Sequence, residues 1–266
     1  MSINSLARTH FIMTNPSHPG NVGAAARAMK TMGFERLRLV KPRFEQMMQH
    51  EEAIAFASGA QDVLANSLEF ASFEEALQGT TLSFALTARP RDIGPNCLHL
   101  RAAAQLAKNH LAADSAHQVA VVFGTERSGL SNEQISHCHY ICYIPANPNY
   151  SSLNIAQAMQ LTAWELRYAL LEAKDSDEAS AIHAEPTSAA HFPAPAQDPL
   201  APQEQVEALM THWQEALEAI EFIDPERPKQ TMLKMRYWLM RSRLTQNECD
   251  MLRGVCTQIL KHANSA

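Results

Sequence analysis

The chain has 266 residues, of which 46% are hydrophobic and 19% are charged, and its formal net charge is −6. This composition supplies enough apolar material for one large core, or for one core and a small second domain. No apolar run approaches the roughly 18 residues that span a bilayer, and the first residues lack a signal-peptide pattern. We therefore expect a cytoplasmic protein with no membrane partner.

The acidic excess lies mainly in one segment. Glu172 to Glu204 holds seven acidic residues and a single basic one, Lys174, whereas Arg227 to Arg243 holds six basic residues and no acidic one. Phosphate contacts require clustered Lys and Arg rather than a positive total. The net charge therefore does not exclude a nucleic-acid partner.

Up to residue 172 the chain alternates apolar runs with helical patterns, which is typical of a mostly parallel sheet flanked by helices. The predicted strands are bounded by Gly, Pro or Asn and run over His10–Thr14, Leu37–Val40, Thr81–Thr87, Gln118–Phe123 and Tyr140–Ile144. The sequence thus predicts an α/β domain over residues 1–172.

The remaining chain divides into a linker and a helical region. Residues 173–203 are rich in Ala, Pro, Ser and acidic residues, which predicts a flexible linker. Residues 204–266 show helical periodicity punctuated by Pro225 and Pro228, which predicts a small all-α domain of three helices.

The middle helix of that domain carries an apolar stripe, Leu233, Tyr237, Met240 and Leu244, with basic residues beside it at seven-residue spacing. One interpretation is an RNA-binding face, and the other is a solvated helix surface. The candidate RNA-binding residues of this region are Lys229, Lys234, Arg236, Arg241 and Arg243.

The first motif follows the first predicted strand and runs from Asn15 to Gly33, through a turn into an Ala-rich helix. Its glycine spacing is neither GxGxxG nor a Walker sequence, so it gives no support for a nucleotide-phosphate loop. Arg27, near the start of the helix, could hold a phosphate or a ribose hydroxyl, or could be a surface salt-bridge residue.

Two further motifs lie at strand ends, where ligands bind in open α/β sheets. The first holds Gly124, Glu126 and Gly129, with Ser131 or Asn132 as a possible helix N-cap. The second begins at Ile144 and continues through a polar loop into a helix that Ser151 or Ser152 could cap.

Together the three motifs, NVGAAAR, FGTERSGLS and IPANPNYSSLN, resemble the ribose-methylating branch of the SPOUT superfamily of RNA methyltransferases. The likeness extends to the LKMRYWLMRSRL segment near the C-terminus and is strongest to bacterial tRNA (cytidine/uridine-2′-O-)-methyltransferases. It implies a deep trefoil knot in the α/β domain, a fold feature that sequence pattern alone does not reveal.

The resemblance also implies the site and its cofactor, S-adenosyl-L-methionine. The residues that would hold the cofactor are Leu86, Thr87, Ala88, Gly124, Ile144, Ser151, Ser152 and Leu153. The catalytic set would be Arg27, Asn21, Asn154, Ser152 and Glu126, and Arg27 would also contact the RNA. Because an arginine stays protonated, we expect Arg27 to orient the ribose and stabilise charge rather than act as a base.

The implied activity is 2′-O-methylation of a ribose in tRNA, at cytidine or uridine of anticodon-loop position 32, by a homodimer in which Arg27 reaches the partner's cofactor. Two alternatives stay open: ribosomal RNA as the substrate, and a non-catalytic RNA-binding protein of the same fold.

No metal is expected. The five cysteines are an odd set without a CxxC pair, which fits reduced thiols better than a disulfide framework or a zinc site. The run from His137 to Cys142 places possible ligands on one face of a strand, but further ligands are missing.

Overall fold

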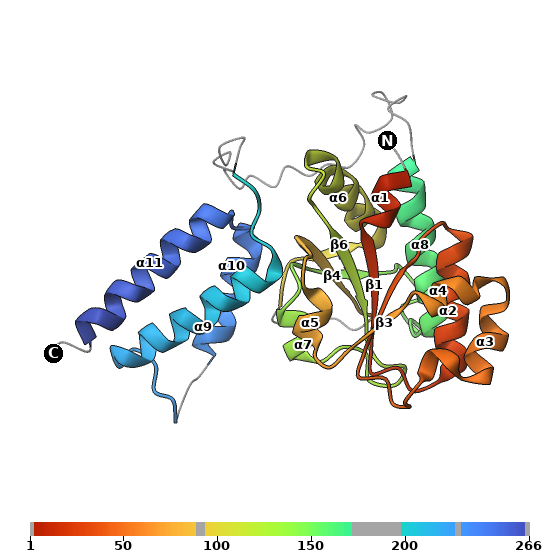
Figure 1. Ribbon diagram of the computed structural model, residues 1–266, viewed down its shortest axis with the longest axis horizontal. Coiled ribbons are helices and arrows are strands. Elements are labelled where there is room, and N and C mark those ends of the chain that lie inside the picture. The colour runs from red at the N-terminus through yellow and green to blue at the C-terminus, as the bar shows by residue number, and fades with distance from the viewer. Residues whose placement is uncertain (1–2, 89–93, 172–197, 227–229, 264–266) are drawn as a thin grey trace.

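The computed structural model describes residues 3–88, 94–171, 198–226 and 230–263. Figure 1 shows a layered α/β domain with three longer helices beside it. Most of the predicted linker, and Lys229 among the candidate RNA-binding residues, lie outside the described residues. No helix in the described ranges is long and apolar enough to cross a membrane.

A seven-stranded sheet forms the centre of the α/β domain, in the order β3-β2-β1-β6-β4-β7-β5, and every described pairing within it is parallel. The strands are β1 Thr9–Thr14, β2 Arg36–Val40, β3 Leu68–Phe70, β4 Leu82–Leu86, β5 Cys97–His99, β6 Val119–Phe123 and β7 Tyr140–Tyr143. The five predicted strands are confirmed to within a residue or two. The predictions omitted β3 and β5, which are three residues long and form the two edges of the sheet.

Helices cover both faces of the sheet. One face carries α1 Ile3–Ala7, α2 Pro19–Thr31, α3 Glu51–Ala57, α4 Gln61–Ala65, α6 Leu100–Ala113 and α8 Ile155–Leu171. The other carries the short helices α5 Phe73–Leu77 and α7 Asn132–Ser136. Short 3-10 turns at Met47–Gln49 and Ser58–Ala60 flank α3.

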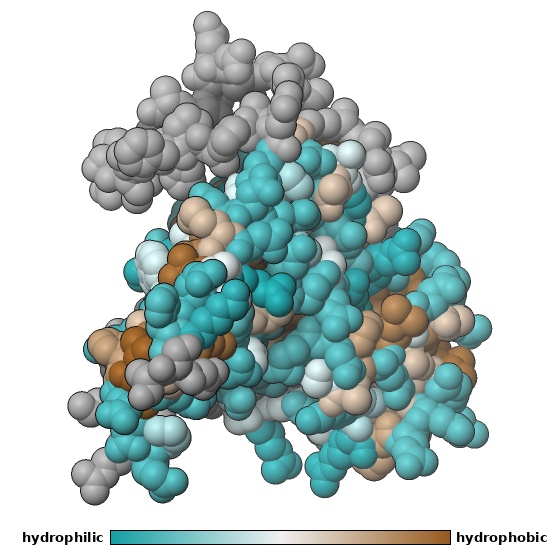
Figure 2. All heavy atoms as spheres, turned by 60° about the vertical axis from the view of Figure 1, so that its left-hand side comes forward, coloured by the Kyte–Doolittle hydropathy of each residue, from teal (hydrophilic) through white to brown (hydrophobic). Residues whose placement is uncertain are grey.

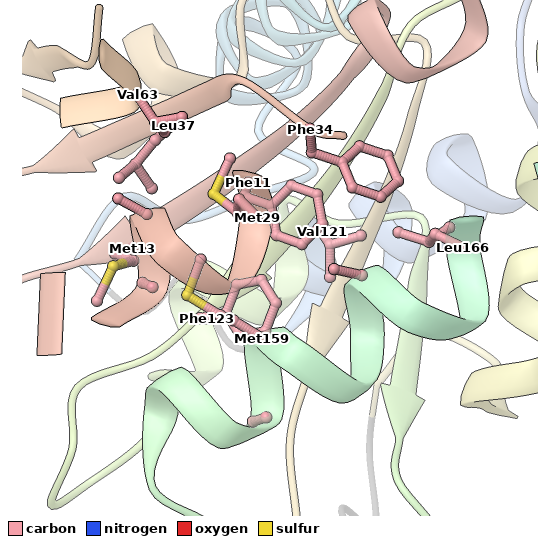
Figure 3. Close-up of a cluster of buried hydrophobic side chains, with 14 of the residues drawn as sticks. Phe11, Met13, Met29, Phe34, Leu37, Val63, Val121, Phe123, Met159 and Leu166 are labelled. Atoms are coloured by element: carbon pink, nitrogen blue, oxygen red, sulfur yellow. The ribbon is translucent and has the colours of Figure 1, made fainter. Parts of the chain in front are cut away.

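Successive residues of the strands enter opposite layers of the core. Phe11 and Met13 of β1 pack with α2 and α8, whereas Ile12 packs on the opposite side with α5 and α7. Phe11 lies at the centre of its layer, with ring centroids 5.1 Å from Phe34 and 5.9 Å from Phe123 (Figure 3). Since both faces of a parallel sheet are covered, a central strand such as β6 reads as a continuous apolar run, and this made it predictable.

Helix α2 lies unusually close to α3. A Cβ added at Gly23 would lie 2.1 Å from the carbonyl oxygen of Ala53, a distance that no side chain tolerates. The glycine therefore permits this packing, which fixes α2 and with it Asn21 and Arg27.

The C-terminal region consists of α9 Gln203–Ala219, α10 Thr231–Ser242 and α11 Gln246–Ala263, as predicted. These helices enclose a separate apolar core. Of the predicted apolar stripe, Tyr237 and Met240 are buried, and Leu233 and Leu244 are half-buried. One face of α10 therefore packs as its periodicity indicated.

The helical domain contacts the α/β domain through polar groups. Gln203, the first residue of α9, donates its backbone N–H to the carbonyl of Thr80 at 3.2 Å and its side-chain amide to the carbonyl of His137 at 3.3 Å. Helices α9 and α10 contact α5 and α7, on the side of the sheet that carries these two short helices (Figure 1).

Arg236 belongs to this contact. Its Nη1 donates to Glu207 Oε1 at 2.5 Å, and His137 Nδ1 lies 3.0 Å from the same oxygen. Burial raises the pKa of Glu207, but the hydrogen bonds from His137 and Arg236 outweigh burial and lower that pKa to about 2. Glu207 is therefore ionised, and Arg236 is its counter-ion.

Arg243 belongs to the contact as well. Its Nη2 donates to His110 Nδ1 at 2.5 Å, and His110 Nε2 lies 2.7 Å from Thr81 Oγ1. Burial and the positive charge of Arg243 lower the pKa of His110 to about 2, so the ring is neutral and able to accept this bond. Arg236 and Arg243 are thus half-buried between the domains and already hydrogen-bonded there, and the prediction that they bind RNA stays untested.

Hydrophilic residues dominate the face drawn in Figure 2, and hydrophobic residues gather toward its left and right margins. Neither this view nor the strand order tests the predicted trefoil knot, which stays a prediction.

Candidate active site

A hollow opens at the carboxyl ends of β4, β6 and β7. All eight residues predicted to hold the cofactor line this hollow: Leu86, Thr87, Ala88, Gly124, Ile144, Ser151, Ser152 and Leu153. They come from three loops that are distant in the sequence, and the parallel sheet brings these loops together because its carboxyl ends share one edge. The first loop is held in place by a bond from the backbone N–H of Thr87 to the carbonyl of Cys142 at 2.9 Å.

Gly124 lies where the loop after β6 folds back on itself. Thr125 and Gly129 exchange two backbone hydrogen bonds, at 3.2 and 3.0 Å, and close a narrow loop. A Cβ at Gly124 would lie 2.1 Å from the carbonyl carbon of Gly129 and 2.3 Å from the nitrogen of Leu130. Only glycine fits, and its bare backbone forms part of the wall of the hollow.

Asn154 connects the third motif to the first. Its Oδ1 accepts from the backbone N–H of Ala156 at 2.9 Å, which caps α8, and its Nδ2 donates to Asn21 Oδ1 at 3.0 Å. The alternative in which Ser151 or Ser152 caps α8 is therefore wrong. Both serines instead lie on the wall of the hollow.

Glu126 connects the second motif to the first. Its carboxylate accepts from Asn21 Nδ2 at 3.1 Å, from Ser17 Oγ at 2.9 Å and from the backbone N–H of Ser17 at 3.2 Å. Burial raises the pKa of Glu126, but hydrogen bonds from its own backbone, from Asn21 and from Ser17 outweigh it and lower the pKa. The carboxylate is thus ionised and fixes the orientation of Asn21, so that Glu126, Asn21 and Asn154 form one hydrogen-bonded chain.

Arg27 lies apart from this chain. It is exposed on α2 and is not among the residues that line the hollow, and its side chain forms no ion pair with another described residue. Within the described part of the chain, Arg27 is therefore neither a surface salt-bridge residue nor part of the hollow of its own subunit.

Sequence reasoning missed several residues of the site. Phe123, Thr125 and Arg127 also line the hollow, and they lie within the second motif or directly beside it. Ser17 was missed because its partner, Glu126, is 109 residues away in the sequence. Of the two residues predicted as possible N-caps of α7, Ser131 and Asn132, the cap is Ser131, which forms a capping box with Gln134.

A sheet whose described pairings are all parallel, with a hollow at its carboxyl edge walled by glycine-containing and serine-containing loops, defines an α/β protein with a candidate ligand site in the position usual for such sheets. The comparisons with known proteins agree. The SpoU rRNA Methylase family matches residues 8–164, and the C-terminal domain of tRNA methyltransferase TrmJ matches residues 204–266.

Similarity to two TrmJ proteins covers almost the whole chain, and similarity to a third protein covers about two thirds of it. The tRNA (cytidine/uridine/adenosine-2′-O-)-methyltransferase TrmJ of Pseudomonas aeruginosa is 36% identical over 97% of this chain and 96% of that protein. The crystal structure of TrmJ from Z. mobilis ZM4 has a TM-score of 0.77 and 29% identity, covering 95% of this chain and 99% of that one. A probable methyltransferase from Bordetella pertussis Tohama I is 60% identical, with a TM-score of 0.62, over 64% of this chain and all of that one.

The chain therefore belongs to the SpoU methylase family and, within it, to the TrmJ group of tRNA 2′-O-methyltransferases.

Proposed function

We propose that this protein transfers a methyl group from S-adenosyl-L-methionine to a ribose 2′-oxygen of tRNA, at cytidine or uridine of anticodon-loop position 32. The observation that carries the proposal is the hydrogen-bonded chain of Glu126, Asn21 and Asn154, which joins the three motifs, and of which Glu126 lines the hollow. The names of the related TrmJ proteins support tRNA rather than ribosomal RNA as the substrate.

The residues of the hollow fit S-adenosyl-L-methionine, which supplies an electrophilic methyl group when it is bound. The side chains of Leu86, Ile144 and Leu153 provide an apolar wall of the kind that suits an adenine ring. The hydroxyls of Ser151 and Ser152 are available for polar contacts, because neither serine caps α8. The ionised carboxylate of Glu126 complements a cationic sulfonium group.

Arg27 is proposed to orient the ribose and to stabilise the negative charge that develops on the 2′-oxygen. Its guanidinium remains protonated and offers five N–H donors, so it is suited to hydrogen bonding and unsuited to removing a proton. Because Arg27 does not line the hollow of its own subunit, we propose that it acts at the hollow of a partner subunit.

The surface of α8 supports a homodimer. Leu161, Trp164, Tyr168 and Leu171 follow one another at helical spacing and are exposed, with 54% of Trp164 and 56% of Tyr168 accessible. Ile155 and Ala158, at the start of the same helix, line the hollow. A second copy packed on this stripe would cover the apolar side chains and lie directly beside the hollow.

Helix α10 offers a second contact with RNA. Lys234, Trp238 and Arg241 are all exposed, and their spacing places them on one face of the helix. Basic side chains around an accessible indole suit a single-stranded loop, in which bases can stack on the ring. We propose this face, without Arg236 and Arg243, as part of the tRNA-binding surface.

The test is methylation by the purified protein. With S-adenosyl-L-methionine and an unmodified tRNA transcript, mass spectrometry of the digested RNA should find one 2′-O-methylated pyrimidine in the anticodon loop. Methylation of ribosomal RNA alone would replace the tRNA assignment. Absence of both cofactor binding and methylation would support the non-catalytic alternative.

Arg27→Ala tests the catalytic assignment. The variant should keep cofactor affinity, since Arg27 does not line the hollow, but should lose about 10²-fold or more in methylation rate. Arg36→Ala is the matched control and should stay active. It removes an exposed arginine at the amino end of β2, whereas the hollow lies at the carboxyl ends of the strands.

Mixing two inactive variants tests the dimer. Arg27→Ala supplies an intact hollow, and a variant with a damaged hollow, such as Gly124→Ala, supplies an intact Arg27. If Arg27 acts across the interface, mixed dimers will contain one complete site and will show activity that neither variant has alone. No recovery on mixing would place Arg27 within its own subunit's site.

A further inference from the structure

A second hollow adjoins the first, on the other side of the loop that follows β6. It is lined by Asn15, Ser17, His18, Lys41, Arg43, Thr125, Glu126 and Arg127. Thr125, Glu126 and Arg127 line both hollows, so a single loop forms their shared wall. A ligand that occupies the second hollow is therefore a close neighbour of whatever occupies the first.

The backbone holds the floor of the second hollow firmly. Asn15 and Lys41 directly follow the adjacent strands β1 and β2, and both adopt the left-handed region, with φ of 47° and 44°. The N–H of Asn15 donates to the carbonyl of Val40 at 2.7 Å, and the N–H of Arg43 donates to the carbonyl of Pro16 at 3.0 Å. These bonds tie the two loops together and fix the backbone from which Lys41 and Arg43 project.

The charge of this hollow is positive. Lys41, Arg43 and Arg127 are exposed on its lining, and Glu126 is its one carboxylate among the described lining residues. That carboxylate already accepts hydrogen bonds from Ser17 and Asn21. Within the described part of the chain, neither Lys41 nor Arg43 forms an ion pair. The two cations are thus available to an anion from solution.

We propose that this second hollow binds the RNA phosphate on the 3′ side of the methylated nucleotide, through Lys41 and Arg43. This inference rests on the proposed function. In a ribose the 2′-oxygen and the 3′-oxygen are on neighbouring carbons, so the 3′ phosphate is the phosphate nearest to the reacting hydroxyl. A methylated 2′-oxygen at the first hollow places that phosphate at the shared wall, and contacts there fix the register of the RNA without reading its sequence.

Charge-removing variants test the assignment. Lys41→Gln and Arg43→Gln should each weaken tRNA binding about tenfold, and each should reduce the salt dependence of binding by about one phosphate contact. The affinity for S-adenosyl-L-methionine should not change, because neither residue lines the first hollow. Arg36→Gln is the control. Arg36 is the first residue of β2, and Lys41 directly follows the last residue of that strand, so Arg36 lies at the far end from the second hollow.

A modified RNA tests the same contact with the wild-type protein, which removes any effect of a variant on folding. An anticodon stem-loop with a neutral methylphosphonate linkage 3′ to the target nucleotide should bind about tenfold more weakly than the natural RNA. Lys41→Gln and Arg43→Gln should then lose little further affinity for this RNA, because the charge that they contact is already absent.

The outcomes separate the two proposals. If the wild-type protein methylates tRNA but binds the methylphosphonate RNA as tightly as the natural RNA, the phosphate site is wrong and the proposed function stands. The same conclusion follows if Lys41→Gln and Arg43→Gln bind tRNA like Arg36→Gln. If the wild-type protein does not methylate RNA and binds neither tRNA nor cofactor, the proposed function itself fails.

Discussion

The ionised Glu207 stabilises the contact between the two domains, and Glu207→Gln should measure by how much. Glu207 accepts from Arg236 and His137, and its pKa falls from 4.5 to about 2. A carboxylate with that change contributes roughly 3 kcal/mol to the stability of the folded state at neutral pH. The glutamine keeps the volume and removes the charge, so we expect a loss of about 2 to 3 kcal/mol.

The assay is urea unfolding of the full chain at pH 7, followed by tryptophan fluorescence, which reports on the helical domain through Trp213 and Trp238. Glu215→Gln, an exposed position on the same helix, is the matched control. Because the folded pKa of Glu207 is depressed, its contribution is complete above about pH 4.5 and disappears as the pH falls to about 2.

The comparison with the wild-type protein should therefore show a difference in unfolding free energy that is constant from pH 7 to about pH 5 and shrinks at lower pH. An unfolding free energy equal to that of Glu215→Gln would refute the assignment of Glu207 to the domain contact. A difference that persists unchanged toward pH 2 would show that packing, rather than charge, is responsible.

Three further predictions concern the wall of the hollow, the cap of α8 and two buried histidines. Gly124→Ala should lose S-adenosyl-L-methionine binding in calorimetry, because its Cβ would meet backbone atoms at 2.1 to 2.5 Å, whereas Gly254→Ala meets nothing within 4 Å and should bind normally. Asn154→Ala should lower the free energy of unfolding by about 1 kcal/mol, because α8 loses its N-cap, and should slow methylation, because Asn21 loses a hydrogen-bond partner. Asn154→Ser can still cap the helix, so it should recover the stability but not the methylation rate. Burial lowers the pKa of His110 to about 2 and of His139 to about 3, so each takes up a proton on unfolding and stability should fall as the pH drops below about 6.5. Replacing both histidines with glutamine should make the free energy of unfolding less dependent on pH below about 6.5. If urea unfolding curves recorded at several pH values give the same pH dependence as the wild-type protein, this prediction is wrong.

The sheet was predictable where its strands are buried on both faces. Runs such as Val119–Phe123 are apolar at every position because α-helices cover both sides of a parallel sheet. The edge strands β3 and β5 gave no such signal, since only one neighbour pairs with each and their side chains are largely exposed. Their existence is decided by tertiary pairing rather than by local composition.

The site was predictable in its location and less so in its bonding. Three strand-end motifs could be assigned to one edge because the carboxyl ends of parallel strands meet there. The cap of α8 was predicted at Ser151 or Ser152, whereas it is Asn154, which was expected only in the catalytic set; serine and asparagine side chains both cap helices, so the pattern does not separate them. Asn154 takes the cap while its amide also reaches Asn21, a contact across 133 residues that no local pattern encodes.

Helix α10 shows why a basic stripe does not identify its own partner. Lys234 and Arg241 are seven residues apart, as are Arg236 and Arg243, and the two pairs are offset by two residues, or about 200° around a helix. The first pair is exposed beside Trp238, whereas the second contacts Glu207 and His110 of the domain interface. The same spacing thus serves two surfaces, and the surface that we propose for RNA binding is the one that the α/β domain leaves uncovered. Reversing the charge of Lys234 and Arg241 should therefore weaken tRNA binding without changing the unfolding free energy. Reversing the charge of Arg236 should instead lower the unfolding free energy, because Arg236 is the counter-ion of Glu207.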